Sequence, residues 1–256
     1  IQESGRNHII LSALDELPSF LAANRLGVLG CSSKVLPGEK RGFISKKSLE
    51  SFITPRTILV SISLANGLTG VINPIKEIAD LCNERGLFLH VDVTHGIGKI
   101  PIDFKASFMT FRGEPLHAPQ GTGVLYVKNG VKSAPLILGG QEQGGLRGGS
   151  FSVANLAGLG MAAKELEESR GYVGTEIARL RSLFEDALLE GIPGCEVLFS
   201  EEDQVPHITA VSFPYVSSEL LLYHLNHASI YACIGGGDFQ PLSQILKACS
   251  DRKSVV

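Results

Sequence analysis

The segment LFLHVDVTHGIGKIPIDF, residues 87–104, places Asp92 at the end of an apolar run and follows it with Thr94 and His95. A carboxylate at the end of a buried strand is costly unless it has a partner. Pyridoxal phosphate chemistry needs an acid of this kind, because a carboxylate keeps the pyridine nitrogen protonated and makes the ring an electron sink. The alternative is that Asp92 only caps a turn, since turns closed by Asp side chains are common. Both interpretations are open on this segment alone.

Repeated short strands must position these side chains. Apolar, β-branched runs predict strands at residues 8–11, 57–63, 87–92, 108–111 and 123–127. Residues 74–85 carry an apolar stripe with helical spacing, with Pro74 suited to the first turn and Gly86 to the end. Such βαβ units predict a mainly parallel sheet covered by helices, whose ligands bind at the carboxyl ends of the strands.

The second half of the chain has a different pattern of predicted secondary structure. The glycine-dense segment LGGQEQGGLRGGSFS, residues 138–152, is expected to be a loop that enters a helix running from Val153 to about Glu168. After Gly171 the pattern predicts a second helix, two strands, a third helix and a short strand, at residues 175–190, 196–199, 208–213, 217–227 and 230–232. We therefore predict a large α/β domain over residues 1–168 and a smaller α+β domain over residues 169–256.

The composition excludes several classes of protein. With 44% hydrophobic and 19% charged residues, the 256-residue chain is globular rather than disordered or fibrous. A net charge of -3 argues against nucleic acid as a partner, and the apolar runs are too short to span a membrane. Five widely spaced cysteines without a CxxC pair favour a reducing compartment, the cytoplasm. His224 and His227 lack a third ligand, so we predict no metal site.

Three ordered segments carry a resemblance to a known family. They are residues 58–104, which contain Asp92, then GGQEQGGLRGGS at 139–150 and HITAVSFPYV at 207–216. Through them the chain, from Arg6 to about Val256, resembles the cysteine desulfurases of the NifS and IscS type, within the class V aminotransferases. The resemblance implies a fold-type I pyridoxal-phosphate architecture and a homodimer. It also implies a sulfur-acceptor protein or an iron-sulfur scaffold as partner.

The resemblance assigns roles to individual residues. The acid that matches Asp92 holds the pyridine nitrogen, and Asn66 falls on a cofactor-contacting asparagine. His95 stands where the family usually has a glutamine beside the phenol oxygen of the cofactor. Ser150 lies where a threonine reaches the cofactor phosphate of the partner subunit.

Two central positions depart from the family pattern. In FMTFRGEPLHAPQGTGVLYV, residues 108–127, Pro115 stands at the position of the cofactor-binding lysine, with Glu114 at a histidine and Arg112 at a serine. Proline has no amine and so provides neither a Schiff base nor a general base. Glu16 stands where the family's cofactor-stacking histidine is expected. The nearby lysines at positions 99 and 105 are expected to be solvated.

The sulfur-carrying cysteine of the family lies on a mobile loop, which here is IYACIGGGDFQP, residues 230–241. Counting without gaps places Gly236 at the nucleophile, whereas the local Ala-Cys pair selects Cys233. A thiol beside three glycines is mobile enough to deliver or accept a persulfide. The alternative is a buried structural cysteine, since free cysteines are often buried.

These observations lead to three hypotheses. The first is an altered cysteine-desulfurase-like protein that has lost the pyridoxal-lysine chemistry, because of Pro115 and Glu16. The second is an active desulfurase that uses another lysine and carries sulfur on Cys233. The third is a non-catalytic interaction module. Since Ile1 is not an initiator methionine and the chain ends at Val256 in a helical pattern, we expect a fragment cut at both ends, whose pocket is incomplete.

Overall fold

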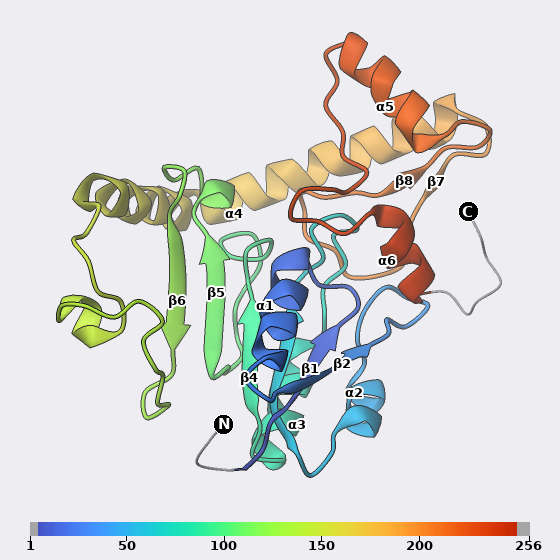
Figure 1. The fold of residues 1–256 in the computed structure, drawn as a ribbon. Coiled ribbons are helices and arrows are strands. Elements are labelled where there is room, and N and C mark those ends of the chain that lie inside the picture. The colour runs from blue at the N-terminus through green and yellow to red at the C-terminus, as the bar shows by residue number, and fades with distance from the viewer. Residues whose placement is uncertain (1–4, 250–256) are drawn as a thin grey trace.

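The structure is a computed structural model that describes residues 5–249. Its centre is a six-stranded sheet in the order β2-β1-β3-β4-β5-β6 (Figure 1). Neighbouring strands run parallel except β5 and β6, which are antiparallel. The strands are β1 (His8–Ser12), β2 (Ser32–Leu36), β3 (Thr57–Ser63), β4 (Phe88–Asp92), β5 (Phe108–Arg112) and β6 (Gly123–Val127). The predicted mainly parallel α/β sheet is confirmed.

Helices cover both faces of this sheet. They are α1 (Leu17–Gly27), α2 (Lys46–Phe52) and α3 (Ile75–Glu84), with the short 3-10 turns η1 (Glu114–Leu116) and η2 (Glu142–Gly145) further along. One face packs Val60, Ile62, Leu89 and Val91 into the main core together with the apolar stripe of α3. The other face packs Ile9 and Leu11 against Ala23 of α1. The predicted crossover helix at residues 74–85 is confirmed as α3.

Helix α4 (Val153–Gly191) differs from the sequence-based expectation, because it is one continuous helix of 39 residues. The prediction of two separate helices, split near Gly171, was wrong. Glycine inside a helix costs only about 1 kcal/mol, so Gly171 and Gly174 weaken this long run without ending it. The predicted domain boundary between residues 168 and 169 lies within α4, and the division into two domains stays a prediction.

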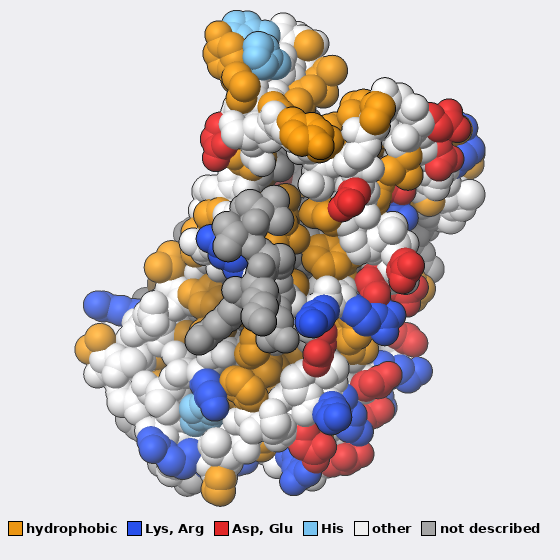
Figure 2. Space-filling model, turned by 90° about the vertical axis from the view of Figure 1, so that its right-hand side faces the viewer, with side chains coloured by type: hydrophobic (Ala, Val, Ile, Leu, Met, Phe, Trp, Pro, Cys, Tyr) orange, Lys and Arg blue, Asp and Glu red, His pale blue; other side chains and the backbone are white. Residues whose placement is uncertain are grey.

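The chain after α4 forms shorter elements. Strands β7 (Glu196–Val197) and β8 (Val211–Ser212) form a two-stranded antiparallel sheet, followed by α5 (Ser218–His227) and α6 (Leu242–Cys249). The predicted strand at 230–232 was wrong: Ile230 and Tyr231 are exposed, and no described strand pairs with them. Helix α5 stands away from the main sheet (Figure 1), and Figure 2 shows hydrophobic side chains gathered around this projection. Across residues 5–249, no helix is long and apolar enough to cross a membrane.

Candidate functional site

Parallel strands end at a common edge, and the structure brings three of the predicted residues, Asp92, Asn66 and His95, to that edge. Asp92 is the last residue of β4, Arg112 is the last of β5, and Asn66 lies in the loop after β3. Glu16 follows β1 immediately before α1. His95 lies in the turn after β4 and reaches Glu16, 79 residues earlier in the chain. This carboxyl edge of the sheet is therefore the candidate functional site.

Asp92 is half-buried and accepts two hydrogen bonds. Its Oδ1 accepts from the backbone N–H of Thr94 at 2.9 Å, which closes the turn after β4. Its Oδ2 accepts from the Thr110 hydroxyl at 3.5 Å. The turn-capping interaction weighed in the sequence is thus present. Two donors hold the carboxylate at the edge of the sheet, and this does not exclude a further ligand.

Asn66 is buried and its side chain joins two loops. Its Nδ2 donates to the Leu14 carbonyl at 2.7 Å, while its Oδ1 accepts from the backbone N–H groups of Leu68 and Thr69 at 2.9 and 2.8 Å. The amide therefore ties the loop after β3 to the loop after β1. This is a structural role, whatever Asn66 also contacts when a ligand is bound.

The Glu16 and His95 side chains form a pair at the centre of the edge. The distance from His95 Nε2 to Glu16 Oε1 is 2.5 Å, and both side chains are mostly buried. The Phe239 ring lies beside the His95 ring, with 5.7 Å between their centroids. A Cβ at Gly67 would lie 2.5 Å from both His95 Nε2 and Phe239 Cε1, so a side chain there would displace one of the two rings. His95 is thus enclosed by the chain's own groups.

Residues 235–241, here called the closing loop, supply Phe239 and lie on the carboxyl edge. Asp238 Oδ2 accepts from Arg112 Nη1 at 2.9 Å, and its carbonyl accepts from the Leu17 N–H at 2.8 Å. Gln240 Nε2 donates to the carbonyls of Ala13 and Asp15 at 2.9 and 2.7 Å. Arg112, which sequence analysis placed at a serine position, therefore binds the closing loop.

Asp15 is a further residue of the edge that sequence analysis did not single out. It is 3% exposed, and its Oδ1 accepts from the Ser63 N–H at 2.8 Å, while its Oδ2 has no hydrogen-bond partner among the described residues. Burial raises the pKa of Asp15 to about 7, and the nearby Asp92 carboxylate adds to this effect. Its signal in the sequence is an acid three residues after a buried strand, a position close to that of Asp92 at the end of β4.

Pro115, which the sequence analysis predicts at the lysine position of the family, lies in η1 between Glu114 and Leu116. Glu114 is exposed and accepts from the Gly121 N–H at 3.1 Å, so it faces the following turn. Lys105 is exposed, as predicted. The prediction for Lys99 was wrong, because it is half-buried and desolvation lowers the pKa of its amine. The pKa of His207 is lowered to about 4, first by burial and second by the positive charge of Lys99.

The two remaining candidate residues are exposed. Ser150 lies in the glycine-rich loop before α4, and its side chain is exposed. Cys233 precedes the closing loop, and its Sγ accepts from the Gly235 N–H at 3.3 Å. The interpretation of Cys233 as a buried structural cysteine was therefore wrong. Gly236 adopts a left-handed φ of 103°, which favours glycine in this turn.

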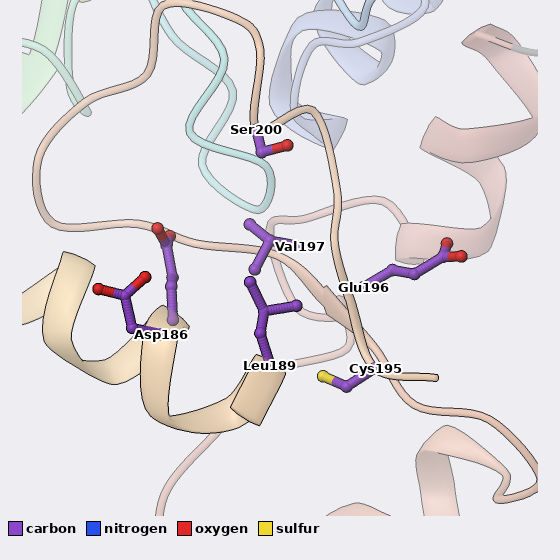
Figure 3. A pocket seen from close by; sticks show the side chains of 7 residues that line it. Asp186, Leu189, Cys195, Glu196, Val197 and Ser200 are labelled. Carbon is purple, nitrogen blue, oxygen red and sulfur yellow. The ribbon is translucent and has the colours of Figure 1, made fainter. Parts of the chain in front are cut away.

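A separate hollow of about 470 Å³ lies in the other half of the molecule, between α4 and β7 (Figure 3). Its lining includes Asp186, Leu189, Cys195 and Glu196. None of the residues predicted from the sequence lines it. Among residues 5–249, no group of three or more His, Cys, Asp or Glu side chains is arranged to hold a metal ion.

Comparisons with known proteins place the chain in a family. The model of the class V aminotransferases matches residues 3–250, so the chain belongs to that family. Within it, the chain is similar to NifS/IscS-type cysteine desulfurases. It is 36% identical over 251 residues to a cysteine desulfurase of Nostoc sp. and 32% identical over 247 residues to the cysteine desulfurase NifS of Azotobacter vinelandii. The resemblance found in the sequence is confirmed.

Solved structures agree on the fold. A NifS-like protein has a TM-score of 0.88 at 27% identity, covering 98% of this chain and 68% of its own. DndA from Streptomyces lividans has a TM-score of 0.82 at 28% identity, covering 97% of this chain and 72% of its own. The predicted fold-type I architecture is thereby confirmed. The two curated relatives are matched over 95% and 93% of this chain, which spans 62% and 61% of their lengths.

Proposed function

We propose that this protein is an altered member of the cysteine desulfurase group that does not hold pyridoxal phosphate as a Schiff base. In this proposal it acts as a homodimeric partner in cysteine sulfur or iron-sulfur metabolism, in the cytoplasm. The observation that carries the proposal is the enclosed pair of Glu16 and His95, with Phe239 beside it. Glu16 and Phe239 each contact His95 at the position where the family's cofactor contacts are expected.

The family uses pyridoxal phosphate, and the described residues fit a covalently held cofactor poorly. A Schiff base requires a primary amine, and Pro115 has none. Glu16 replaces a ring that would stack on the pyridine and instead binds His95 at 2.5 Å. Asp92 and Asn66 are retained, and their hydrogen bonds within the chain do not exclude a further ligand held without a covalent bond. We therefore assign no reaction step to the cofactor in this protein.

The homodimer is supported by an exposed apolar surface beside β6 and the first part of α4. Leu136 and Leu138 are 95% and 81% exposed. Further exposed apolar residues nearby in the chain are Ile137, Leu146, Phe151, Val153, Leu156 and Met161. Large contiguous apolar patches on soluble proteins usually mark contacts with another chain. A second copy is the occupant that the family resemblance implies.

The sulfur partner is supported by the exposed thiol of Cys233. Sulfur transfer needs no net oxidation: the Cys233 thiolate attacks the outer sulfur of a donor persulfide, the donor S–S bond breaks, and the donor leaves as a thiolate. Cys233 then carries the persulfide. Cys233 is exposed and its Sγ accepts a hydrogen bond from the Gly235 N–H, so the sulfur is accessible to a donor persulfide.

A second candidate function is an active desulfurase that uses another lysine. The half-burial of Lys99 favours this alternative, because a lowered pKa makes an amine more available as a nucleophile. Cys233 would still carry the sulfur. The alternative of a pure interaction module predicts that Asp92→Ala leaves any ligand binding unchanged.

The test is the release of alanine and sulfide from cysteine by the full-length protein with added pyridoxal phosphate. A functional NifS-type enzyme serves as the positive control. We expect no release above background. Release that is lost in both Lys99→Ala and Cys233→Ser variants, with Lys105→Ala as the matched control, would establish the second candidate instead.

A further inference from the structure

Four polar side chains form a ladder of hydrogen bonds across the middle strands of the sheet. Ser61 of β3 pairs in register with His90 of β4, and Thr110 of β5 pairs with Asp92. The Ser61 hydroxyl lies 2.8 Å from His90 Nδ1, and the Thr110 hydroxyl lies 2.9 Å from His90 Nε2. Thr110 in turn reaches Asp92 Oδ2. The ladder thus runs from a buried serine to the carboxylate at the edge.

The hydrogen-bonding capacity of each group indicates which atom donates and which accepts along the ladder. An ionised Asp carboxylate only accepts hydrogen bonds, so the single hydroxyl proton of Thr110 points to Asp92. The Thr110 oxygen then accepts from His90, which places the ring proton on Nε2. His90 Nδ1 has no proton in this state and accepts from the Ser61 hydroxyl. Every donor and acceptor between Ser61 and Asp92 is used once.

The surroundings of His90 agree with a neutral ring. A charged imidazolium would donate from both nitrogens, and the Thr110 and Ser61 oxygens could then both accept. Burial opposes that charge and lowers the pKa of His90, although the Asp92 charge acts in the opposite direction. Ser61 is 6% exposed, so one end of the ladder is closed to water.

We propose that His90, as the neutral Nε2–H tautomer, is a positioning residue that fixes the Asp92 carboxylate through Thr110. The ladder keeps Asp92 Oδ2 in one orientation at the carboxyl edge and commits it to accepting hydrogen bonds. The carboxylate is therefore held in an orientation in which it accepts from a further hydrogen-bond donor. This inference goes beyond the proposed function, because it holds whether or not any lysine forms a Schiff base.

The experiment is nitrogen-15 NMR of the imidazole rings in the uniformly labelled full-length protein at neutral pH. For His90 we expect Nδ1 to resonate as an unprotonated nitrogen and Nε2 as a protonated one. Thr110→Val removes the acceptor of Nε2–H and the donor to Asp92. It should abolish this pattern and shift the carbon-13 resonance of the Asp92 carboxyl at the same pH.

Two controls separate positioning from packing. Thr110→Ser keeps the hydroxyl and should restore both signatures. Thr122→Val removes a hydroxyl that bonds the Pro119 carbonyl outside the ladder, so it should leave both unchanged. An Nδ1–H tautomer or an imidazolium at His90 in the wild-type protein overturns the proposal, and this measurement needs no variant to fold. Unchanged His90 and Asp92 signals in Thr110→Val overturn it equally.

Discussion

At the scale of single residues, the carboxyl groups of Asp15 and Asp92 both lie at the carboxyl edge of the sheet, but in different environments. Asp92 is half-buried and receives two donors, whereas Asp15 is buried with one carboxylate oxygen unpartnered. Burying a charge without full compensation is costly, so the fold favours the protonated form of Asp15. This is why the pKa of Asp15 rises to about 7 from its ordinary value of 3.8.

The raised pKa of Asp15 makes stability fall as the pH rises. Between pH 4 and pH 7 the unfolded chain has released the Asp15 proton while the folded chain still holds it, so unfolding is favoured. The contribution lost is up to about 4 kcal/mol. Asp15→Asn should remove this component of the pH dependence, as measured by the free energy of unfolding in urea at pH 5 and pH 8. An unchanged pH dependence in this variant would contradict the account, and Asp80→Asn, at an exposed carboxyl of α3, is the control.

At the scale of elements, the sequence correctly predicted the strands and the helix whose apolar residues pack into the main core. The strands at residues 57–63 and 87–92 and the helix at 74–85 carry buried apolar residues at regular spacing. Strand β2 was missed because its residues SSKVL are mostly polar and lie at an exposed edge. The split in α4 was predicted from Gly171, whose local cost the rest of the long helix outweighs.

The closing loop is the element on which the candidate site depends most. Its ion pair between Arg112 and Asp238 is partly exposed and contributes under about 1 kcal/mol. The Phe239 ring, packed near His95 and Gly67, is the stronger contact. Phe239→Ala should therefore speed amide deuterium exchange at Leu17 and Leu242, whose N–H groups bond Asp238 and Ile234.

The matched control for this exchange experiment is Tyr215→Ala, which removes a fully exposed ring elsewhere. We expect exchange at Leu17 and Leu242 to rise at least several-fold in Phe239→Ala and to stay unchanged in Tyr215→Ala. Equal rates in the wild-type protein and Phe239→Ala would mean that the ring does not hold the closing loop in place.

At the scale of the whole molecule, the site could be predicted only in part. Asp92 was found because it ends a strand that the pattern predicts. The roles of Asn66 and His95 were implied by the family resemblance, and all three residues lie at the edge where parallel strands end together. The Glu16 to His95 pair and the contact from Phe239 join residues far apart in the chain, so no local pattern indicates them. The half-burial of Lys99 depends on tertiary packing for the same reason.

The proposed homodimer is a whole-molecule property with its own test. Leu138→Asp places a charge on an exposed apolar residue beside the glycine-rich loop and should weaken the dimer at least tenfold. Sedimentation velocity of the full-length protein measures the dissociation constant. Leu21→Asp, at an exposed residue of α1, is the control and should leave it unchanged. A wild-type protein that is monomeric at micromolar concentration would refute the homodimer.

The central claim is that no lysine of this protein holds pyridoxal phosphate. The most direct measurement is the visible absorbance of the full-length protein titrated with pyridoxal phosphate, followed by borohydride reduction and mass mapping of every lysine. The account predicts no labelled lysine above the level of a denatured control. A single lysine labelled stoichiometrically, Lys99 above all, would contradict it and identify an active pyridoxal enzyme.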